Sequence, residues 1–504
     1  MPLQKNQVFT LRVERLSSDG SGVAHSPDGE TVFIPGAAPG DEARVRIVKD
    51  CKRYAFGILD EVLTPSPDRI PVDCAVAGPC GGCSLRHLDY AAELRAKQEN
   101  VADAFARIGG LDVPVLPIVG SPEVNRYRNK VQFPVGADKS GKPCIGFYAG
   151  RTHRIVPCPD CRLQPGVLNE IGNALCAFFA EKGIQPYSEE TGRGLVRHIF
   201  LRRGAHSGQI MVCLVCTRAK LPSAEELCTR LKAQFAEITT ILLNVNAKNT
   251  NVILGTETHT LYGQGYIEDT LCGVPVQLGP LSFYQVNTLA AEQLYGIAAQ
   301  YAQLTPDDLL LDLYCGMGTI GLSMAAHCRE LIGVEIVPEA IESAKANAAR
   351  MGADVAAKSR FFCADAGQAA TRLAAEGLHP DIVMLDPPRK GCDEATLSAV
   401  VRMSPRRVVY VSCNPATAAR DAAWLEQNGY HAEKVQPVDL FPRTRHCEAV
   451  LLLTKLHVER HIEVDVSMDE LDVTAAESKA TYNEIRDYVW EHHQLKVSNL
   501  YIAQ

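Results

Sequence analysis

The sequence predicts a multidomain α/β protein with a C-terminal Rossmann-like domain, a strand-rich central region and an N-terminal OB-like β-barrel. A chain of 504 residues is too long for one hydrophobic core. Apolar strands alternate with Ala-rich helical stretches from residue 309 onward, at 309–313, 331–335, 360–364, 381–385 and 407–412. This alternation predicts a parallel, doubly wound sheet.

The N-terminal segment, residues 1–65, predicts the barrel. Five short apolar runs are separated by Gly, Pro and Asp turns, and residues 44–48 alternate between polar and apolar as a half-buried strand does. Five such strands fit a small closed barrel of the OB kind, which is a frequent platform for oligonucleotides. Pro65, Pro67 and Pro71 then mark a linker.

The central region, residues 66–280, contains basic segments. A helix is expected over 90–108, ended by Gly109 and Gly110, followed by strands and one clear helix near 166–182. Residues 126–154 hold seven Lys or Arg against one acid, and residues 191–206 hold four Arg and no acid, although the whole chain carries a net charge of −8. Such a patch suits a phosphate backbone, while a solvated surface is the alternative for either segment alone.

The chain contains neither a secretory signal nor an apolar run long enough to span a membrane. A cytoplasmic protein is therefore expected, with no membrane association and no obligate protein partner evident. Thiols stay reduced in that compartment, so the 18 cysteines are core residues, metal ligands or catalysts. Residues 281–458 form the Rossmann-like domain, and residues 459–504 predict an acidic linker with a small helical extension.

A glycine-bearing turn follows the first strand of the Rossmann-like domain, in the stretch LLLDLYCGMGTIGLSMA. Gly316 and Gly318 let the backbone approach a ligand closely, and Glu335 ends the next strand, where an acid binds ribose hydroxyls. Gly321 completes a G-x-G-x-x-G pattern. On spacing alone, a nicotinamide-dependent dehydrogenase is therefore a rival interpretation.

Three acids favour S-adenosylmethionine (SAM) as the cofactor. Asp312 ends the first strand, where it can neutralise a cationic ligand. Asp365 follows the third strand, a place for adenine contact. Asp386 follows the fourth strand and precedes two prolines, at the edge of the sheet where ligands of such folds bind.

A thiol and a carboxylate follow at neighbouring strand ends. Cys413 closes an apolar strand and precedes Asn-Pro, and Glu448 begins another apolar strand. Together they suit methylation of a pyrimidine C5, since thiolate addition at C6 makes C5 nucleophilic and a base must then remove the C5 proton. Cys413 is the predicted nucleophile and Glu448 the predicted base.

A second cysteine set predicts a metal site. Cys74, Cys80 and Cys83 follow a C-x5-C-x2-C spacing in a glycine-rich loop, and Cys158 or Cys161 offers a fourth thiolate. Zinc fits this spacing as well as an iron–sulfur cluster does. The spacing differs from the C-x3-C-x2-C of radical SAM enzymes.

These stretches resemble the RNA uracil-5 methyltransferase (RumA/TrmA) family over nearly the whole chain. The matching stretches are SFYQVN (282–287), LDLYCGMGTIGL (311–322), GVEI (333–336), LDPPRKG (385–391), YVSCNPATAARD (410–421) and FPRTRHCEAVLLL (441–453). The resemblance implies that residues 1–62 form a TRAM domain, an RNA-binding barrel. It implies SAM contacts from Gln285, Tyr314, Glu335 and Asp386, with Cys413 as nucleophile and Glu448 as base.

The resemblance also bears on the cysteine set. It favours Cys161 as the fourth ligand, because the family's ligand precedes a run like Arg162–Pro165, and it implies a [4Fe-4S] cluster. That cluster is typical of the ribosomal-RNA branch. The expected activity is SAM-dependent formation of 5-methyluridine in 23S rRNA that is unassembled or partly folded. The alternatives are the same chemistry on the tRNA T-loop, or a non-catalytic RNA-binding or ribosome-assembly protein.

Overall fold

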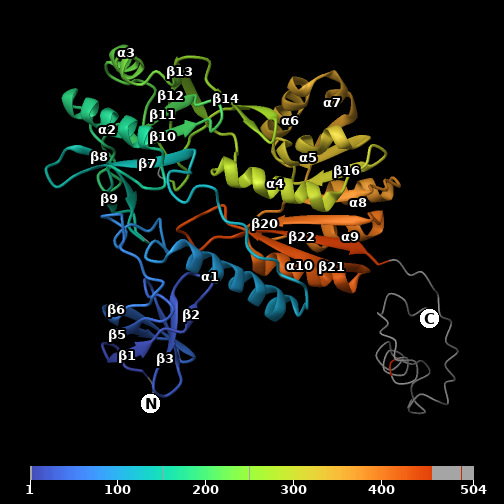
Figure 1. The fold of residues 1–504 in the computed structure, drawn as a ribbon. Helices are drawn as coiled ribbons and strands as arrows, with labels where there is room; N and C mark the ends of the chain where they lie inside the picture. The colour runs from blue at the N-terminus through green and yellow to red at the C-terminus, as the bar shows by residue number, and fades with distance from the viewer. Residues whose placement is uncertain (1–2, 151, 249, 457–489, 491–504) are drawn as a thin grey trace.

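The computed structural model describes residues 3–150, 152–248, 250–456 and 490, which form four β-sheets with helices around them (Figure 1). The barrel lies at one end of the molecule, and the central sheet and the C-terminal sheet lie beside each other above it. Among the described helices, none combines the length and the apolar character that crossing a membrane requires.

The barrel is a six-stranded sheet in the order β1-β5-β6-β4-β3-β2. Its alternating strands point residues such as Ala43, Val45 and Ile47 into a small core. The sequence predicted five strands; the sixth, Arg15–Leu16, has two residues, too few to show a periodicity. The strands are β1 (Val8–Arg12), β2 (Arg15–Leu16), β3 (Gly22–His25), β4 (Thr31–Ile34), β5 (Glu42–Asp50) and β6 (Tyr54–Thr64).

A long helix connects the barrel to the rest of the molecule. In α1 (Tyr90–Asp103), the N-cap Asp89 accepts a hydrogen bond from the Ala92 N–H at 2.6 Å. The helix continues as a π-helix, η1 (Ala104–Gly109), and Gly110 ends it with a φ of +61°. Figure 1 shows α1 alongside α10 and β21 of the C-terminal domain. The predicted helix therefore has the expected extent, but its last turn is a π-helix.

The central sheet has seven strands in the order β13-β12-β11-β10-β7-β8-β9. Two helices cover it, and the sequence predicted only the first. The second was missed because it is short and polar. The elements are β7 (Lys130–Ala137), β8 (Pro143–Tyr148), β9 (Ile155–Pro157), α2 (Gly166–Glu181), β10 (Val196–Arg203), β11 (Ile210–Cys216), α3 (Ala224–Gln234), β12 (Ile238–Val245) and β13 (Glu257–Tyr262).

Packing does not divide at residue 280, where the sequence placed a domain boundary. The hairpin of β14 (Ile267–Leu271) and β15 (Val274–Leu278) shares a hydrophobic core with α4 (Thr288–Ala302) and with Leu310 of the C-terminal sheet. Val101 and Phe105 of the long helix likewise pack into the core of the C-terminal domain. Both segments therefore pack with the C-terminal domain, and the hairpin shares its core with Phe200 and Met211 of the central sheet as well.

The C-terminal sheet has the order β18-β17-β16-β19-β20-β22-β21. The five strands that the sequence predicted are parallel, as expected, and two further strands extend the sheet, because β22 runs antiparallel to both β20 and β21. The strands are β16 (Leu309–Leu313), β17 (Glu330–Glu335), β18 (Ser359–Cys363), β19 (Ile382–Leu385), β20 (Arg407–Ser412), β21 (Tyr430–Val438) and β22 (Glu448–Lys455). The helices are α5 (Thr319–Met324), η2 (Ala325–His327), α6 (Pro338–Met351), α7 (Ala353–Lys358), α8 (Ala366–Ala375), α9 (Glu394–Met403) and α10 (Pro415–Gln427).

This topology gathers the predicted site at one edge of the sheet. The five parallel strands end at the same edge, and the antiparallel strand β22 begins there. The residues that follow those strand ends, and Glu448 at the start of β22, therefore lie along one line. The predicted extension, residues 459–504, lies outside the described residues apart from Trp490.

Candidate active site

The turn after β16 has the tight backbone that its glycines predicted. Gly316 and Gly318 have φ values of +56° and +78°, and Tyr314 takes +65°, a conformation that costs energy for a residue with a side chain. Glu335 fixes this turn. Its Oε2 accepts a hydrogen bond from the Gly316 N–H at 3.2 Å, and its Oε1 accepts one from the Val337 N–H at 2.9 Å.

Asp312 lies buried beneath the same turn with one oxygen available. Its Oδ2 accepts a hydrogen bond from the Gly321 N–H at 3.0 Å, whereas its Oδ1 is buried without a partner among the described residues. Burial, with smaller contributions from the charges of Asp386 and Glu335, raises the pKa of Asp312 to about 8. A cation bound beside it would stabilise the ionised carboxylate, as the sequence predicted.

The third glycine of the turn has a local structural role. A Cβ on Gly321 would lie 2.8 Å from Asp312 Oδ2 and 2.8 Å from Leu331. Gly321 therefore permits the contact with Asp312 and the packing of α5 on the sheet. The third glycine of a G-x-G-x-x-G pattern serves such packing in dinucleotide-binding folds too, so Gly321 does not distinguish the two cofactors.

Gln285 and Asp365 flank the turn at greater distance. Gln285 precedes α4, and its backbone carbonyl accepts a hydrogen bond from Asn129 Nδ2 at 2.7 Å. Asp365 caps α8, where its Oδ1 accepts a hydrogen bond from the Gln368 N–H at 3.1 Å. Asp365 therefore has a structural role as the N-cap of α8. A contact with adenine stays a prediction.

The turn that carries Cys413 is held by the side chain of Asn414. Its Oδ1 accepts from the Ala416 N–H at 3.2 Å and so caps α10, whose first residue is Pro415. Its Nδ2 donates to the backbone carbonyl of Arg389 at 2.9 Å. The Cys413 turn and the loop after Asp386 are therefore tied together, and the Cys413 thiol is half-buried at the sheet edge rather than packed in a core.

Glu448 is 6% exposed and begins the strand that pairs with the Cys413 strand. Burial and the charge of Asp386, opposed by the charge of Arg389, together raise the pKa of Glu448 to about 8. Burial also raises the pKa of the half-buried Asp386, to about 7. Glu448 thus holds a proton more strongly than an ordinary glutamate, as suits a group that accepts one.

Arg389 lies close to Cys413 and Glu448 and was not predicted as a site residue. Burial raises the pKa of the Cys413 thiol, as do the charges of Glu448 and Asp386, whereas the charge and a hydrogen bond of Arg389 lower it. Arg389 Nη2 also lies 3.5 Å from His446 Nδ1. Its position directly after the two prolines was the available signal, because a cation at that place faces the next strand end.

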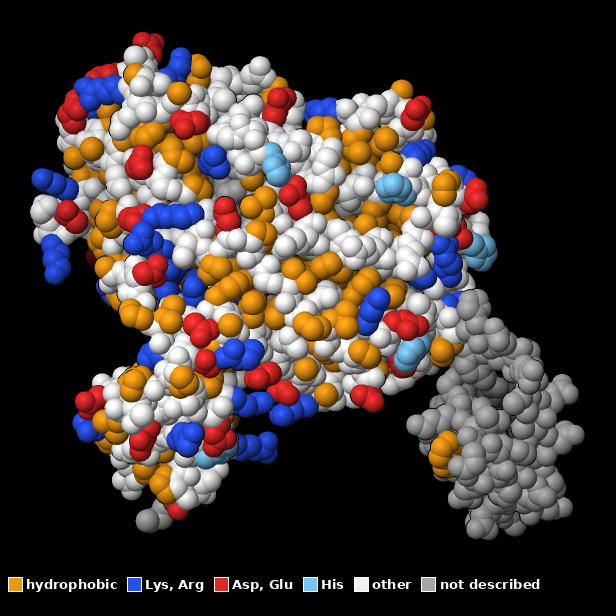
Figure 2. Space-filling model, viewed as in Figure 1, with side chains coloured by type: hydrophobic (Ala, Val, Ile, Leu, Met, Phe, Trp, Pro, Cys, Tyr) orange, Lys and Arg blue, Asp and Glu red, His pale blue; other side chains and the backbone are white. Residues whose placement is uncertain are grey.

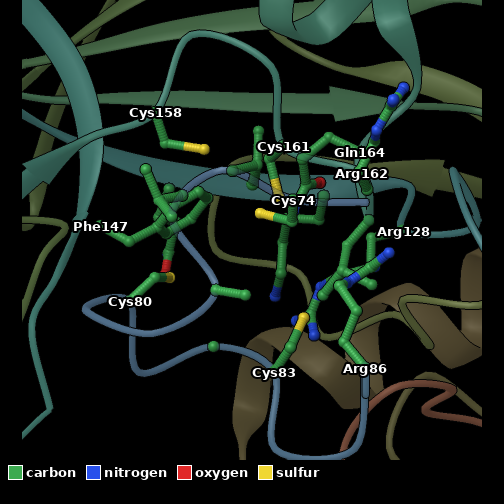
Figure 3. A pocket seen from close by; sticks show the side chains of 17 residues that line it. Cys74, Cys80, Cys83, Arg86, Arg128, Phe147, Cys158, Cys161, Arg162 and Gln164 are labelled. Atoms are coloured by element: carbon green, nitrogen blue, oxygen red, sulfur yellow. The ribbon is translucent and has the colours of Figure 1, made fainter. Parts of the chain in front are cut away.

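Five cysteines line a cavity of about 280 Å³ on the flank of the central domain (Figure 3). They are the predicted ligands Cys74, Cys80, Cys83 and Cys161, together with Cys158. The side chains of Cys158 and Cys161 contact each other, so both candidates for the fourth ligand reach the same place. The cavity therefore brings together cysteines from two segments that are distant in the chain, 74–83 and 158–161.

The sulfurs around the cavity are not arranged as the ligands of a single bound ion. In a zinc site four sulfurs surround the ion at about 2.3 Å and so lie roughly 3.8 Å from one another. Within the described part of the chain, no three His, Cys, Asp or Glu side chains are arranged to hold a metal ion, and the sulfurs enclose an open space. Arg86, Arg128 and Lys130 also line the cavity and offset the negative charge of a thiolate-bound group.

The basic segments are less available to RNA than their composition predicted. Arg126 is paired with Asp160 at 2.7 Å, and the fully buried Arg202 donates to the backbone carbonyls of Gly279 and Ser282. Arg197 is 5% exposed and donates to two backbone carbonyls. In Figure 2, Lys and Arg side chains still gather on the flank that Figure 1 assigns to β7–β9. Sequence composition could not separate these surface cations from the buried ones.

Comparisons with known proteins show the family of the chain. The family model described as tRNA (uracil-5-)-methyltransferase matches residues 89–456, and the TRAM domain model matches residues 2–59. Uncharacterized RNA methyltransferases of Halalkalibacterium halodurans and Clostridium tetani are 43% identical over 453 residues and 40% identical over 454 residues. Each alignment covers 90% of this chain and 98% of the relative.

A solved structure has the same fold over most of the chain. The tRNA (uracil-54, C5)-methyltransferase of Pyrococcus abyssi, in complex with S-adenosyl-L-homocysteine, superposes with a TM-score of 0.70 and 26% identity. The match covers 89% of this chain and 100% of that one. The chain therefore belongs to the tRNA (uracil-5-)-methyltransferase family, and it is a SAM-dependent RNA uracil-5 methyltransferase with an N-terminal TRAM domain.

Proposed function

We propose that this protein forms 5-methyluridine in 23S rRNA in the cytoplasm, with Cys413 as nucleophile and Glu448 as base. The observation that carries the chemistry is the placement of the half-buried Cys413 thiol, the buried Glu448 carboxylate and the Asp312–Glu335 turn along one sheet edge. Gln285, Tyr314, Gly316, Glu335, Asp365 and Asp386 are the proposed SAM contacts.

The reaction begins with activation of the uracil ring. The Cys413 thiolate, stabilised by the adjacent Arg389 guanidinium, adds to C6 and leaves C5 with enolate character. SAM supplies an electrophilic methyl group, which C5 attacks, and the sulfonium leaves as a neutral thioether. The product of this step is a methylated ring bonded through C6 to Cys413.

Glu448 completes the reaction. Its carboxylate takes the proton that remains on C5, the electron pair re-forms the C5–C6 double bond, and the Cys413 thiolate leaves. The raised pKa of Glu448 makes the carboxylate a stronger base than an exposed glutamate. Its start position on β22 places it beside the thiol from which the ring is released.

The cysteine cavity supports a [4Fe-4S] cluster held by Cys74, Cys80, Cys83 and Cys161. Four cysteine thiolates are the ligand set of such a cluster, and these four side chains line one cavity. Anaerobically purified protein should then contain about four iron and four sulfide per chain, as a four-thiolate cluster implies. Stoichiometric zinc without iron would contradict this assignment.

The cysteine cavity is also the basis for proposing ribosomal RNA as the substrate, because the resemblance associates the cluster with that branch. Mapping 5-methyluridine in 23S rRNA and in tRNA of a deletion strain tests it directly. We expect one or more rRNA positions to lose the methyl group and the tRNA T-loop to keep it. The similar Pyrococcus abyssi protein, named for its action on tRNA, makes the T-loop the second candidate. Loss of T-loop methylation alone would favour that candidate.

A further inference from the structure

The 83–88 segment follows the cysteine loop and contributes two side chains to the cavity, those of Cys83 and Arg86. Arg86 is 3% exposed, and its Nη1 donates to Asp73 at 2.7 Å and to Asn125 at 3.0 Å. Its Nε and Nη2 are buried without an oxygen or nitrogen acceptor among the described residues, and the Cys83 thiol is the sulfur that the guanidinium contacts. Figure 3 shows the Arg86 guanidinium beside Cys83. Buried donors without acceptors destabilise a protein. A sulfur-containing group bound in the cavity would provide hydrogen-bond acceptors for the Arg86 guanidinium.

The same segment binds one residue of the C-terminal domain on its other side. The N–H groups of Ser84 and Leu85 both donate to the backbone carbonyl of Arg443, at 3.0 Å and 3.1 Å. In return, Arg443 Nη1 donates to the backbone carbonyl of Leu88 at 2.8 Å. Three hydrogen bonds therefore join this short segment to a single residue that is very distant in the sequence.

Arg443 needs such support, because its backbone is in the left-handed region. Its φ is +69°, which is unfavourable for a residue with a Cβ and persists only where surrounding contacts hold it. The opposite side of Arg443 is held by α1, since its N–H donates to Glu93 Oε1 at 2.7 Å. Lys97 Nζ bonds the same Glu93 oxygen at 2.7 Å and Asp439 Oδ1 at 2.8 Å.

Arg443 is the middle residue of the 439–447 loop, which leads from β21 to Glu448 at the start of β22. In the ladder between these strands Val438 lies opposite Glu448, so the loop both leaves and returns at the position of the carboxylate. His446, which lies near Arg389, belongs to the same loop. The position of Glu448 at the sheet edge therefore depends on the conformation of this loop, which the contacts of Arg443 stabilise.

We propose that the 83–88 segment couples the cysteine cavity to the position of Glu448. A group bound in the cavity would fix the side chains of Cys83 and Arg86, and so the position of the 83–88 segment. Because this segment is hydrogen-bonded to the strained Arg443, it would also restrict the motion of the 439–447 loop. This inference rests on the proposed function for the identity of the group in the cavity and for the role of Glu448. It assigns the cavity an effect on the active site that requires no electron transfer.

Hydrogen–deuterium exchange on the full chain tests the coupling. Protein purified anaerobically is compared with the same protein after chelation under oxidising conditions, and metal and sulfide are measured in both. We expect amides of the 439–447 loop to exchange at least about tenfold faster in the emptied protein. Amides of β16 should keep their rate. Equal exchange of the loop in the two forms would overturn the coupling, whereas a loaded protein without iron would instead contradict the proposed cluster.

Two loaded variants provide the matched comparison. Arg443→Ala removes the bond to Leu88 in a residue that does not line the cavity, so the metal content should equal that of wild type. Loop exchange should accelerate several-fold, and the difference between loaded and emptied protein should shrink. Arg445→Ala, at an exposed position of the same loop, should leave the exchange unchanged. If removal of the bound group unfolds the whole protein, the test rests on the loaded variants alone. Unchanged exchange of the loop in Arg443→Ala would then overturn the proposal.

Discussion

Cys413 and Glu448 each lie one residue beyond Ser412 and Ala449, the pair that ends the antiparallel ladder between β20 and β22. Directly opposed residues have Cβ atoms about 5 Å apart on the same face of a sheet. A thiol that adds to C6 of uracil and a carboxylate that takes the proton from C5 act on adjacent ring atoms. The register of this strand pair therefore matches the spacing of the proposed reaction.

Removal of the two groups should stop the reaction at different stages. Cys413→Ala should abolish methyl transfer while SAM and RNA still bind, because C5 is never activated. Titration calorimetry with SAM and a filter-binding assay with RNA check the binding, and methyl incorporation checks the activity. Normal turnover in this variant would falsify the assignment of Cys413 as the nucleophile.

Glu448→Gln should instead accumulate an intermediate. Addition and methyl transfer can proceed, but the C5 proton stays and the thiol cannot leave. A covalent protein–RNA adduct that already carries the methyl group should appear on a denaturing gel when the SAM methyl is radiolabelled. The double variant with Cys413→Ala should show no such band. An unlabelled adduct would indicate that Glu448 acts before methyl transfer.

Arg389 should activate the thiol. Arg389→Met removes the charge and hydrogen bond that oppose the raised pKa of Cys413, so that pKa should rise further. The rate of alkylation of Cys413 by iodoacetamide, followed against pH by mass spectrometry, measures this shift. The exposed neighbour Lys390 offers a matched control, and Lys390→Met should leave the profile in place. Identical profiles for both variants would remove Arg389 from the mechanism.

The burial of Glu448 should make the protein less stable as the pH rises. Its folded pKa of about 8 exceeds the ordinary 4.5, so between these values the folded protein binds the proton that the unfolded chain has lost. The free energy of unfolding then falls with rising pH, by up to about 1.4 kcal/mol per pH unit for this group. Urea unfolding across this range should show Glu448→Gln gaining stability relative to wild type as pH increases. If the difference in the free energy of unfolding between Glu448→Gln and wild type stays constant with pH, the pKa of Glu448 in the folded protein is near its ordinary value.

The ion network under the 439–447 loop should be important for stability. Although burial lowers it, the charges of Asp439 and Glu93 raise the pKa of Lys97, so the buried ammonium stays charged. Lys97→Met leaves two buried carboxylates without their cation and should cost about 3–5 kcal/mol. Arg95→Met breaks an exposed pair on the same helix and should cost less than about 1 kcal/mol. Denaturant unfolding measures the free energy of unfolding of both variants. Equal losses of stability would contradict the role of the buried network in stabilising the fold.

Local patterns in the sequence were sufficient for the elements whose neighbours in the chain determine them. The apolar strands, the glycine turn at Gly316 and the acids at strand ends all follow from short-range periodicity and backbone chemistry. The same holds for Cys413, because an Asn-Pro after a strand end gives a turn whatever the rest of the molecule does. These features predicted the chemistry without knowledge of which strands pair.

Tertiary structure decided the remainder, because the decisive contacts join residues far apart in the chain. Arg202 belongs to a basic segment that the sequence predicted as a patch for RNA, whereas the structure shows that its side chain is buried. The antiparallel course of β22 sets Glu448 opposite Cys413, and composition carries no information about strand direction. The contact of Arg443 with the 83–88 segment closes a loop that contains most of the chain, which only the packed core can impose.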